Sequence, residues 1–541
     1  MNKFRTIVLL LLTVTLVMIS CDDILDADSQ RLTAEEDYRL ATPSDSVYSI
    51  FGILSQLQKV ADGYVLLGEL RADLMEVDPD AEKDLLDIYN HTIRKDNKYA
   101  NIRNYYSIIN NCNYMLNYLD TAKVERGELL SRKHYAAVQA IRAWTYMQIV
   151  LNFKTAKYYS KPILSVKDAE MNFPELTMEA LADSLIPILE PLRSIPTPNI
   201  GYIDAYNTDY SFFPVQFVLG DLYLWKGEYQ KAAEQYRDLM YTNSIAINKE
   251  YSSSWTSVNN TISSSGTLNW INSLLINSGE VITAITCPTE YGQDYTLDTL
   301  NNHKKIRPTA LAIHNWDSPV YYLNEASNTN GDLRKYGSIS YSEETARQFS
   351  SDFNFDNNPP SDYIIYKYKI YQQNVTIYRS ALLYLRYAEA INRMNKPNTA
   401  FAVLKHGLNS TTMFNASVVP ASERDVPLAE YMNFADMRFQ NNVGIRMRGL
   451  GNMDKDTTFY RLPKQATLLD SVRMVEDLIQ QELALETAFE GNRYHDLMRI
   501  TLRRMKDGDD ASYLAEKVAA KYNDPARMKN FLMNPDNWYI K

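Results

Sequence analysis

The stretch Gln216–Met240, QFVLGDLYLWKGEYQKAAEQYRDLM, decides how the chain folds. Gly220 and Ala232 are small where two halves of this stretch would touch, so two helices can approach closely there. Gly227 lies between the halves and supports a turn. The stretch therefore predicts a hairpin of two packed helices.

The same stretch matches the tetratricopeptide (TPR) pattern at a series of positions. They are Leu219, Gly220, Tyr223, Gly227, Tyr229, Ala232 and Tyr236. A second copy fits less closely in Leu385–Leu408, and Ala136–Leu151 supplies a further, degenerate unit. One such unit cannot bury its apolar face alone, so several irregular units must pack together. The predicted fold class is mostly α, a TPR-like helical-repeat scaffold.

Residues of about 248–375 differ in composition from the helical blocks of about 38–247 and 376–541. They are rich in Ser, Thr, Asn and Tyr and contain only short apolar runs. We expect a loop-rich insert with a few short strands, and binding residues concentrate in such segments. Three of the six tryptophans fall here, in polar surroundings: Trp255, Trp270 and Trp316.

The first twenty residues have a short basic start and an uncharged apolar run, which is typical of a secretory signal peptide. Cys21 follows Ser20 at the expected cleavage point. Val17–Cys21 resembles a bacterial lipobox, in which the cysteine is acylated, although Met18 and Ile19 depart from the usual residues. The alternative is a plain signal peptide with an incidental cysteine. We expect a lipid anchor at Cys21, with residues 21–37 as a flexible acidic tether.

Composition excludes several classes of protein. The net charge of −10 argues against a nucleic-acid partner, whose electrostatic footprint is basic. No second long apolar stretch follows residue 20. The six histidines are scattered, and no zinc, phosphate-binding or nucleophile motif occurs. Cys112 falls on the apolar face of a helical pattern over Ala100–Leu119, where we expect it to be buried.

Two acidic groups have both a functional and a structural interpretation. Gly68–Glu76, followed by more aspartates, is either a polar or calcium ligand site or a helix end in which Arg71 pairs with a carboxylate. Glu482, Glu486 and Glu490 recur at four-residue steps before Gly491, which would end their helix, and Arg493 follows. A catalytic cluster is conceivable, but a structural Glu–Arg network between helices is the favoured interpretation.

Several of these motifs, taken in order, resemble the SusD/RagB family. They are the acylated cysteine, GELRADLM at 68–75, INNCNYML at 109–116, LGDLYLWKGEYQKA at 219–232, YLRYAEAINR at 384–393 and ETAFEGNRYHDLMR at 486–499. The resemblance implies a non-catalytic outer-membrane lipoprotein that needs no cofactor or metal. It also implies a lid on a TonB-dependent, SusC-like β-barrel transporter, which captures oligosaccharides or oligopeptides.

The resemblance places ligand contacts after GELRADLM and in the insert. The candidates are Asp73, Tyr89, Asn90, Trp255, Trp270 and Trp316. His91, which follows Tyr89 and Asn90, is a further candidate. We expect an oligosaccharide ligand, and an oligopeptide is the alternative because the segment after GELRADLM contains no tryptophan. Two other classes stay open: a surface glycan hydrolase and a TPR-type adaptor that binds only protein.

Overall fold

The structure is a computed structural model that describes residues 43–541, apart from short internal ranges. Those ranges are 123, 125–128, 204–205, 259–260, 268, 288–295, 325–326, 341–359, 372–373 and 451–454. The predicted signal peptide, Cys21 and the tether therefore lie outside the described residues.

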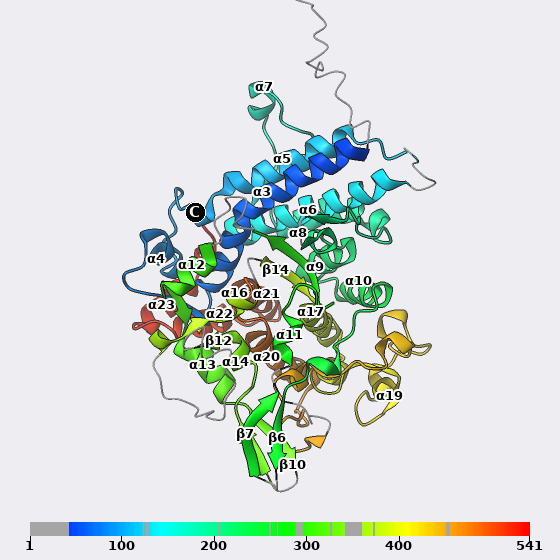
Figure 1. Cartoon of the computed structure of the whole chain (residues 1–541), viewed down its shortest axis with the longest axis vertical. Coiled ribbons are helices and arrows are strands. Elements are labelled where there is room, and N and C mark those ends of the chain that lie inside the picture. The colour runs from blue at the N-terminus through cyan, green and yellow to red at the C-terminus, as the bar shows by residue number, and fades with distance from the viewer. Residues whose placement is uncertain are drawn as a thin grey trace, which may run out of the picture.

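Helices dominate the described residues and share one hydrophobic core (Figure 1). The helices of the scaffold are α3 (Pro43–Glu69), α4 (Lys83–Tyr89), α5 (Ile102–Tyr118), α6 (Leu130–Phe153), α8 (Met178–Leu189), α9 (Val215–Lys226), α10 (Tyr229–Thr242), α17 (Ser380–Arg393), α18 (Pro397–Lys405), α20 (Leu468–Glu486), α21 (Arg493–Lys506), α22 (Ser512–Ala519) and α23 (Pro525–Leu532). Helices α3, α5 and α6 pack side by side at the top of Figure 1. Cys112 on α5 is buried, as its periodicity predicted.

The two predicted hairpins are confirmed. Helices α9 and α10 pack against each other, and Gly227 makes the turn with φ +86°. A Cβ on Gly220 would lie 2.3 Å from the Tyr236 ring, so only glycine allows this approach. Helices α17 and α18 form the second hairpin and pack in the same way. The mostly α, helical-repeat fold class is therefore correct.

The loop-rich region contributes short helices and paired strands, as expected. Its helices are α11 (Trp270–Ser273), α12 (Thr296–Asn302), α13 (Ala310–Asp317), α14 (Lys335–Ser338) and α16 (Lys367–Ile370). Its strands include β6 (Ser254–Val258), β7 (Thr261–Thr267), β8 (Val281–Thr286), β9 (Ile306–Pro308), β10 (Val320–Asn324) and β11 (Ser327–Asn330). Among the described residues, every sheet has two strands.

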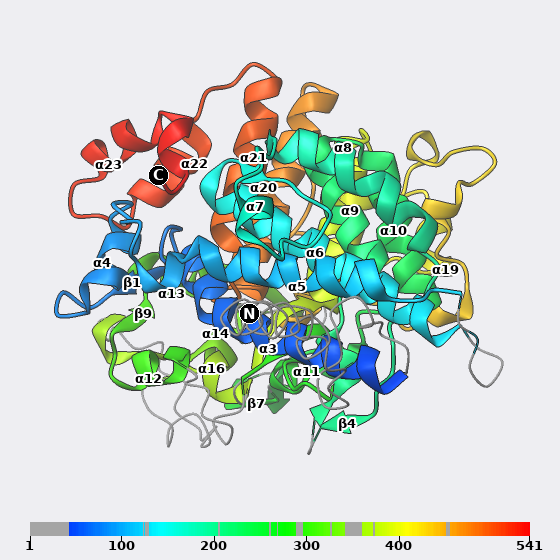
Figure 2. The same cartoon turned by 90° about the horizontal axis from the view of Figure 1, so that it is seen from above.

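Two antiparallel strand pairs attach this region to the scaffold. Strand β8 pairs with β14 (Asn374–Arg379), which leads directly into α17. Strand β9 pairs with β1 (Met75–Val77), which follows α3. Figure 2 shows α4, β1 and β9 on the same side of the molecule as α22 and α23. The residues after GELRADLM therefore lie between the insert and the C-terminal helices.

Among the residues described, no helix has the length and apolarity that a membrane span requires.

Candidate functional site

The acidic group at the end of α20 is a buried network of ion pairs. Glu482 and Glu486 are completely buried, and Glu490 is nearly so. Their cationic partners come from distant parts of the chain: Arg334 with Glu482 at 2.6 Å and Glu486 at 2.8 Å, Arg379 with Glu486 at 2.6 Å and Glu490 at 2.8 Å, Arg448 with Glu486 at 3.1 Å, Arg446 with Glu482 at 3.3 Å, and Lys367 with Glu490 at 2.7 Å. The structural interpretation holds, because these contacts join the insert, β14 and α20.

The geometry of this network differs from the prediction in two respects. Helix α20 ends at Glu486, so Glu490 lies in the connection to α21 rather than on the same helix. Arg493 pairs with none of the three glutamates and instead forms a bidentate ion pair with Asp73, with both N–O distances 2.8 Å. Burial alone would raise the pKa of Glu486, but Arg379 and its neighbouring arginines hold it well below the usual range.

Three of the residues predicted to contact a ligand make contacts inside the protein instead. Trp270 and Trp316 have no exposed surface; their indole N–H groups donate to Glu486 Oε1 (3.1 Å) and to the Leu485 carbonyl (3.2 Å). Asp73 is buried against Arg493. In this conformation none of these side chains presents a face to a ligand, so all three are corrected to structural positions. The Trp255 side chain lies outside the described residues.

The segment after GELRADLM is fixed by ion pairs. Arg307 of β9 contacts Glu76 at 2.7 Å and Asp78 at 3.0 Å, which pins β1 to the insert. Arg94 contacts Asp84 at 2.8 Å and Asp87 at 2.6 Å, which closes the loop that follows α4. The aspartates of this segment therefore brace the loop. The predicted pairing of Arg71 with a carboxylate is absent among the described residues.

Tyr89 ends α4 and packs against the C-terminal helices. Its ring centroid lies 4.9 Å from that of Tyr522, whose hydroxyl donates to the Tyr89 carbonyl. The Lys521 ammonium lies 4.4 Å from the centroid of the Tyr89 ring and donates to the carbonyls of Leu70 and Met75. Asn90 is exposed and caps α4. These contacts hold the following residue, His91, in place.

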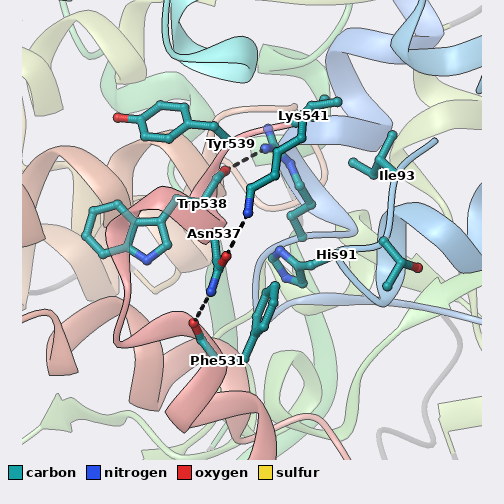
Figure 3. A pocket seen from close by; sticks show the side chains of 10 residues that line it. His91, Ile93, Phe531, Asn537, Trp538, Tyr539 and Lys541 are labelled. Carbon is teal, nitrogen blue, oxygen red and sulfur yellow. Dashed lines mark hydrogen bonds between the residues drawn. The ribbon is translucent and has the colours of Figure 1, made fainter. Parts of the chain in front are cut away.

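A pocket of about 220 Å³ opens between His91 and the C-terminal residues. It is lined by Arg71, His91, Thr92, Ile93, Phe531, Asn537, Trp538, Tyr539, Ile540 and Lys541. Figure 3 shows the rings of His91 and Phe531 next to each other, with Lys541 reaching towards Asn537. Lys541 Nζ donates to Asn537 Oδ1 at 3.2 Å. The pocket thus combines an exposed aromatic ring, an amide and cationic groups.

His91 has an unusual conformation and an unsatisfied nitrogen. Its φ of +56° lies in the left-handed region, which non-glycine residues seldom adopt. Its Nε2 is buried and has no hydrogen-bond partner among the described residues. Burial, together with the positive charges of Arg71 and Lys521, holds the pKa of His91 well below its usual value. The imidazole is therefore neutral at pH 7.

The sequence named His91 as a candidate contact but did not name Phe531, Asn537 and Lys541, which line the same pocket. One signal for Phe531 was present. In α23 the buried residues are Met528 and Leu532, four positions apart, whereas Phe531 lies off that face and is 37% exposed. Trp538, by contrast, is buried, and its indole donates to the Leu532 carbonyl at 2.7 Å.

Comparisons with known proteins give a match at the level of three-dimensional structure. No protein-family model matches the sequence, and no curated protein sequence matches it. A SusD superfamily protein from Bacteroides vulgatus is similar, with a TM-score of 0.55 and 17% identity, over 92% of this chain and 98% of the other.

Two further solved structures are similar over most of their length. A SusD homolog from Bacteroides thetaiotaomicron has a TM-score of 0.57 and 15% identity, over 94% of this chain and 92% of the other. Surface glycan-binding protein A from Bacteroides uniformis has a TM-score of 0.53 and 16% identity, over 92% and 96% respectively. At these identities the similarity establishes the fold, and the chain adopts the fold of the SusD superfamily.

Proposed function

We propose that this protein is a non-catalytic, lipid-anchored surface protein that captures nutrient oligosaccharides and passes them to a TonB-dependent, SusC-like transporter. The observation that carries the binding role is the pocket at His91. The segment expected to hold ligand forms one wall of it, and Phe531 and Asn537 face it from the C-terminal side. Two proteins of similar fold are described as a surface glycan-binding protein and a SusD-like carbohydrate binding protein.

The chemistry of the pocket suits a sugar. A pyranose ring has an apolar C–H surface that packs on a flat aromatic ring, which Phe531 offers with 37% of its surface exposed. Its hydroxyl groups need donors and acceptors, and the side-chain amide of Asn537 supplies both. The amide already donates to the Phe531 carbonyl at 2.9 Å, so its orientation is fixed.

An oligopeptide in the same role is the second candidate. It is favoured because the one tryptophan in the pocket lining, Trp538, is buried and offers no stacking face. Titrating the mature protein against a glycan panel and a mixed peptide digest by calorimetry separates the two. We expect glycan binding, and binding of peptides alone would overturn the choice of ligand.

The absence of catalysis and the membrane attachment have separate tests. Incubation with the bound glycans is expected to release no new reducing ends, and reproducible turnover would instead indicate a hydrolase. Cys21→Ala is expected to move the protein from the membrane fraction to the soluble fraction, and a β-barrel transporter is expected to co-purify with the anchored form. Membrane retention of Cys21→Ala would refute acylation.

A further inference from the structure

Arg71 is a buried cation without an anionic partner. Its side chain is 1% exposed, and it lies just after the end of α3. Its Nε donates to the Leu67 carbonyl at 2.7 Å, its Nη1 to the Trp538 carbonyl at 3.1 Å, and its Nη2 to Asn152 Oδ1, while His495 Nε2 lies 3.3 Å from the same Nη2. The guanidinium carbon also lies 4.3 Å from the centroid of the Tyr494 ring. All of these partners are neutral, and no described carboxylate forms an ion pair with this guanidinium.

Other arginines buried to the same degree are neutralised. Those with less than 2% exposure are Arg334, Arg379, Arg448 and Arg499 besides Arg71, and each of the four forms an ion pair with a carboxylate. Arg142, at 3% exposure, also lacks a carboxylate, but of these residues only Arg71 lines the pocket. A buried charge without an anionic partner is costly, so an anion beside Arg71 would be favoured.

The pocket lining supplies further groups suited to an anion. It contains no aspartate or glutamate side chain, while the Lys541 ammonium lies at its wall. His91 adds no negative charge to the lining, because its imidazole is neutral and hydrogen-bonds to the Arg71 backbone. The five guanidinium N–H groups of Arg71 have four partners among the described residues, which leaves a second N–H on Nη1 without an acceptor there.

We propose that this pocket selects acidic sugars, by seating the carboxylate of a uronic acid residue against Arg71 and Lys541 while Phe531 packs on the ring. This rests on the proposed function and adds a charge preference to it. The volume of about 220 Å³ is below the range of about 300–1,000 Å³ that holds drug-sized ligands, so the pocket fits one sugar residue of a longer chain.

The test compares two probes that differ by one charge. Binding of a trisaccharide capped by glucuronic acid is measured against its carboxyl-reduced, glucose-capped counterpart. Hydrogen bonds to charged groups contribute enough that we expect the acidic probe to bind about 10- to 100-fold more tightly. Equal affinity for both probes would overturn the charge preference while leaving glycan capture intact, so the two failures are distinguishable.

Two variants localise the preference without removing Arg71, whose loss risks misfolding. Lys541→Gln removes the ammonium at the pocket wall and is expected to reduce the preference for the acidic probe about tenfold. Lys506→Gln, beside a separate pocket lined by Met498 and Trp225, is the control and should keep the preference. An undiminished preference in Lys541→Gln would refute the placement.

A second pair of probes identifies the source of the carboxylate. A tripeptide with a free C-terminal carboxylate is compared with its C-terminal amide. We expect neither to compete with the acidic trisaccharide. Preferential binding of the free-acid peptide over that trisaccharide would overturn the assignment to a sugar.

Discussion

The side chains of Glu486 and Arg71 are equally buried, but their charges are balanced in different ways. Glu486 contacts Arg334, Arg379 and Arg448. Arg71 has neutral acceptors and borders a pocket. A buried charge with a complete set of partners holds elements together, whereas one left without a partner beside a cavity is available to a ligand. Our proposal assigns a structural role to the first charge and ligand binding to the second.

Removing the charge at the centre of the paired region should have the largest effect. Glu486→Gln leaves three arginines facing a neutral amide, and breaking a buried pair costs about 3–5 kcal/mol. We expect a fall of that size in the free energy of unfolding, measured by urea denaturation monitored by tryptophan fluorescence. A loss below about 1 kcal/mol would mean that the network does not join the insert to the scaffold.

Glu69 is a third buried ionisable group, and one of its carboxyl oxygens has no partner among the described residues. Its effect on stability should therefore depend on pH. Its Oε1 accepts from the Gly491 amide at 2.8 Å, and Oε2 has no partner among the described residues. Burial raises its pKa to about 8. The folded state therefore binds a proton that the unfolded state releases above pH 4.5, so stability from this group is lost as the pH rises towards 8.

Glu69→Gln mimics the protonated form and should remove that dependence. Between pH 5 and 7.5 we expect the wild-type protein to lose about 3 kcal/mol relative to the variant. Thermal unfolding of both proteins across this range measures the difference. Parallel stability curves would show that the Glu69 carboxyl is ionised in the folded protein at pH 5.

Phe531→Ala tests the wall of the pocket with little effect on folding. We expect oligosaccharide affinity to fall about tenfold, or ~1.4 kcal/mol, because the aromatic face is lost. The matched control is Phe414→Ala at the end of α19 (Ser410–Phe414), where an exposed ring lies outside the pocket lining. Equal losses in both variants, measured by calorimetry, would remove Phe531 from the site.

The smallest effect should come from an exposed ion pair. Lys529 and Glu516 lie 2.7 Å apart with 43% and 59% of their side chains exposed. Lys529→Gln is expected to change the free energy of unfolding by less than about 1 kcal/mol, since solvent screens such pairs. A change as large as that of Glu486→Gln would mean that burial does not decide the strength of these pairs.

The structural features that depend on local residue spacing were predictable from the sequence. Gly220, Gly227 and Ala232 fall within one hairpin, so their pattern is sufficient to place two helices. The spacing of Glu482 and Glu486 likewise revealed one half of the buried network. Its other half was not predictable, because Arg334 lies 148 positions from Glu482 and no local pattern links them.

The candidate site was predictable only in part, for the same reason. His91 was named as a candidate because it follows a recognised motif, but the residues facing it come from 531–541. Trp270 and Trp316 were misplaced because their polar sequence neighbours suggested exposure. Their indoles instead contact α20, which lies more than 160 positions away in the sequence.

The most direct test is a crystal structure of the mature protein with the glucuronic acid-capped trisaccharide. We predict density for the acidic sugar in the pocket, with its carboxylate within hydrogen-bond distance of Arg71 Nη1 and Lys541 Nζ and its ring on Phe531. Density for the ligand at another surface, with this pocket empty, would contradict the assignment of the unpaired charge at Arg71 to ligand binding.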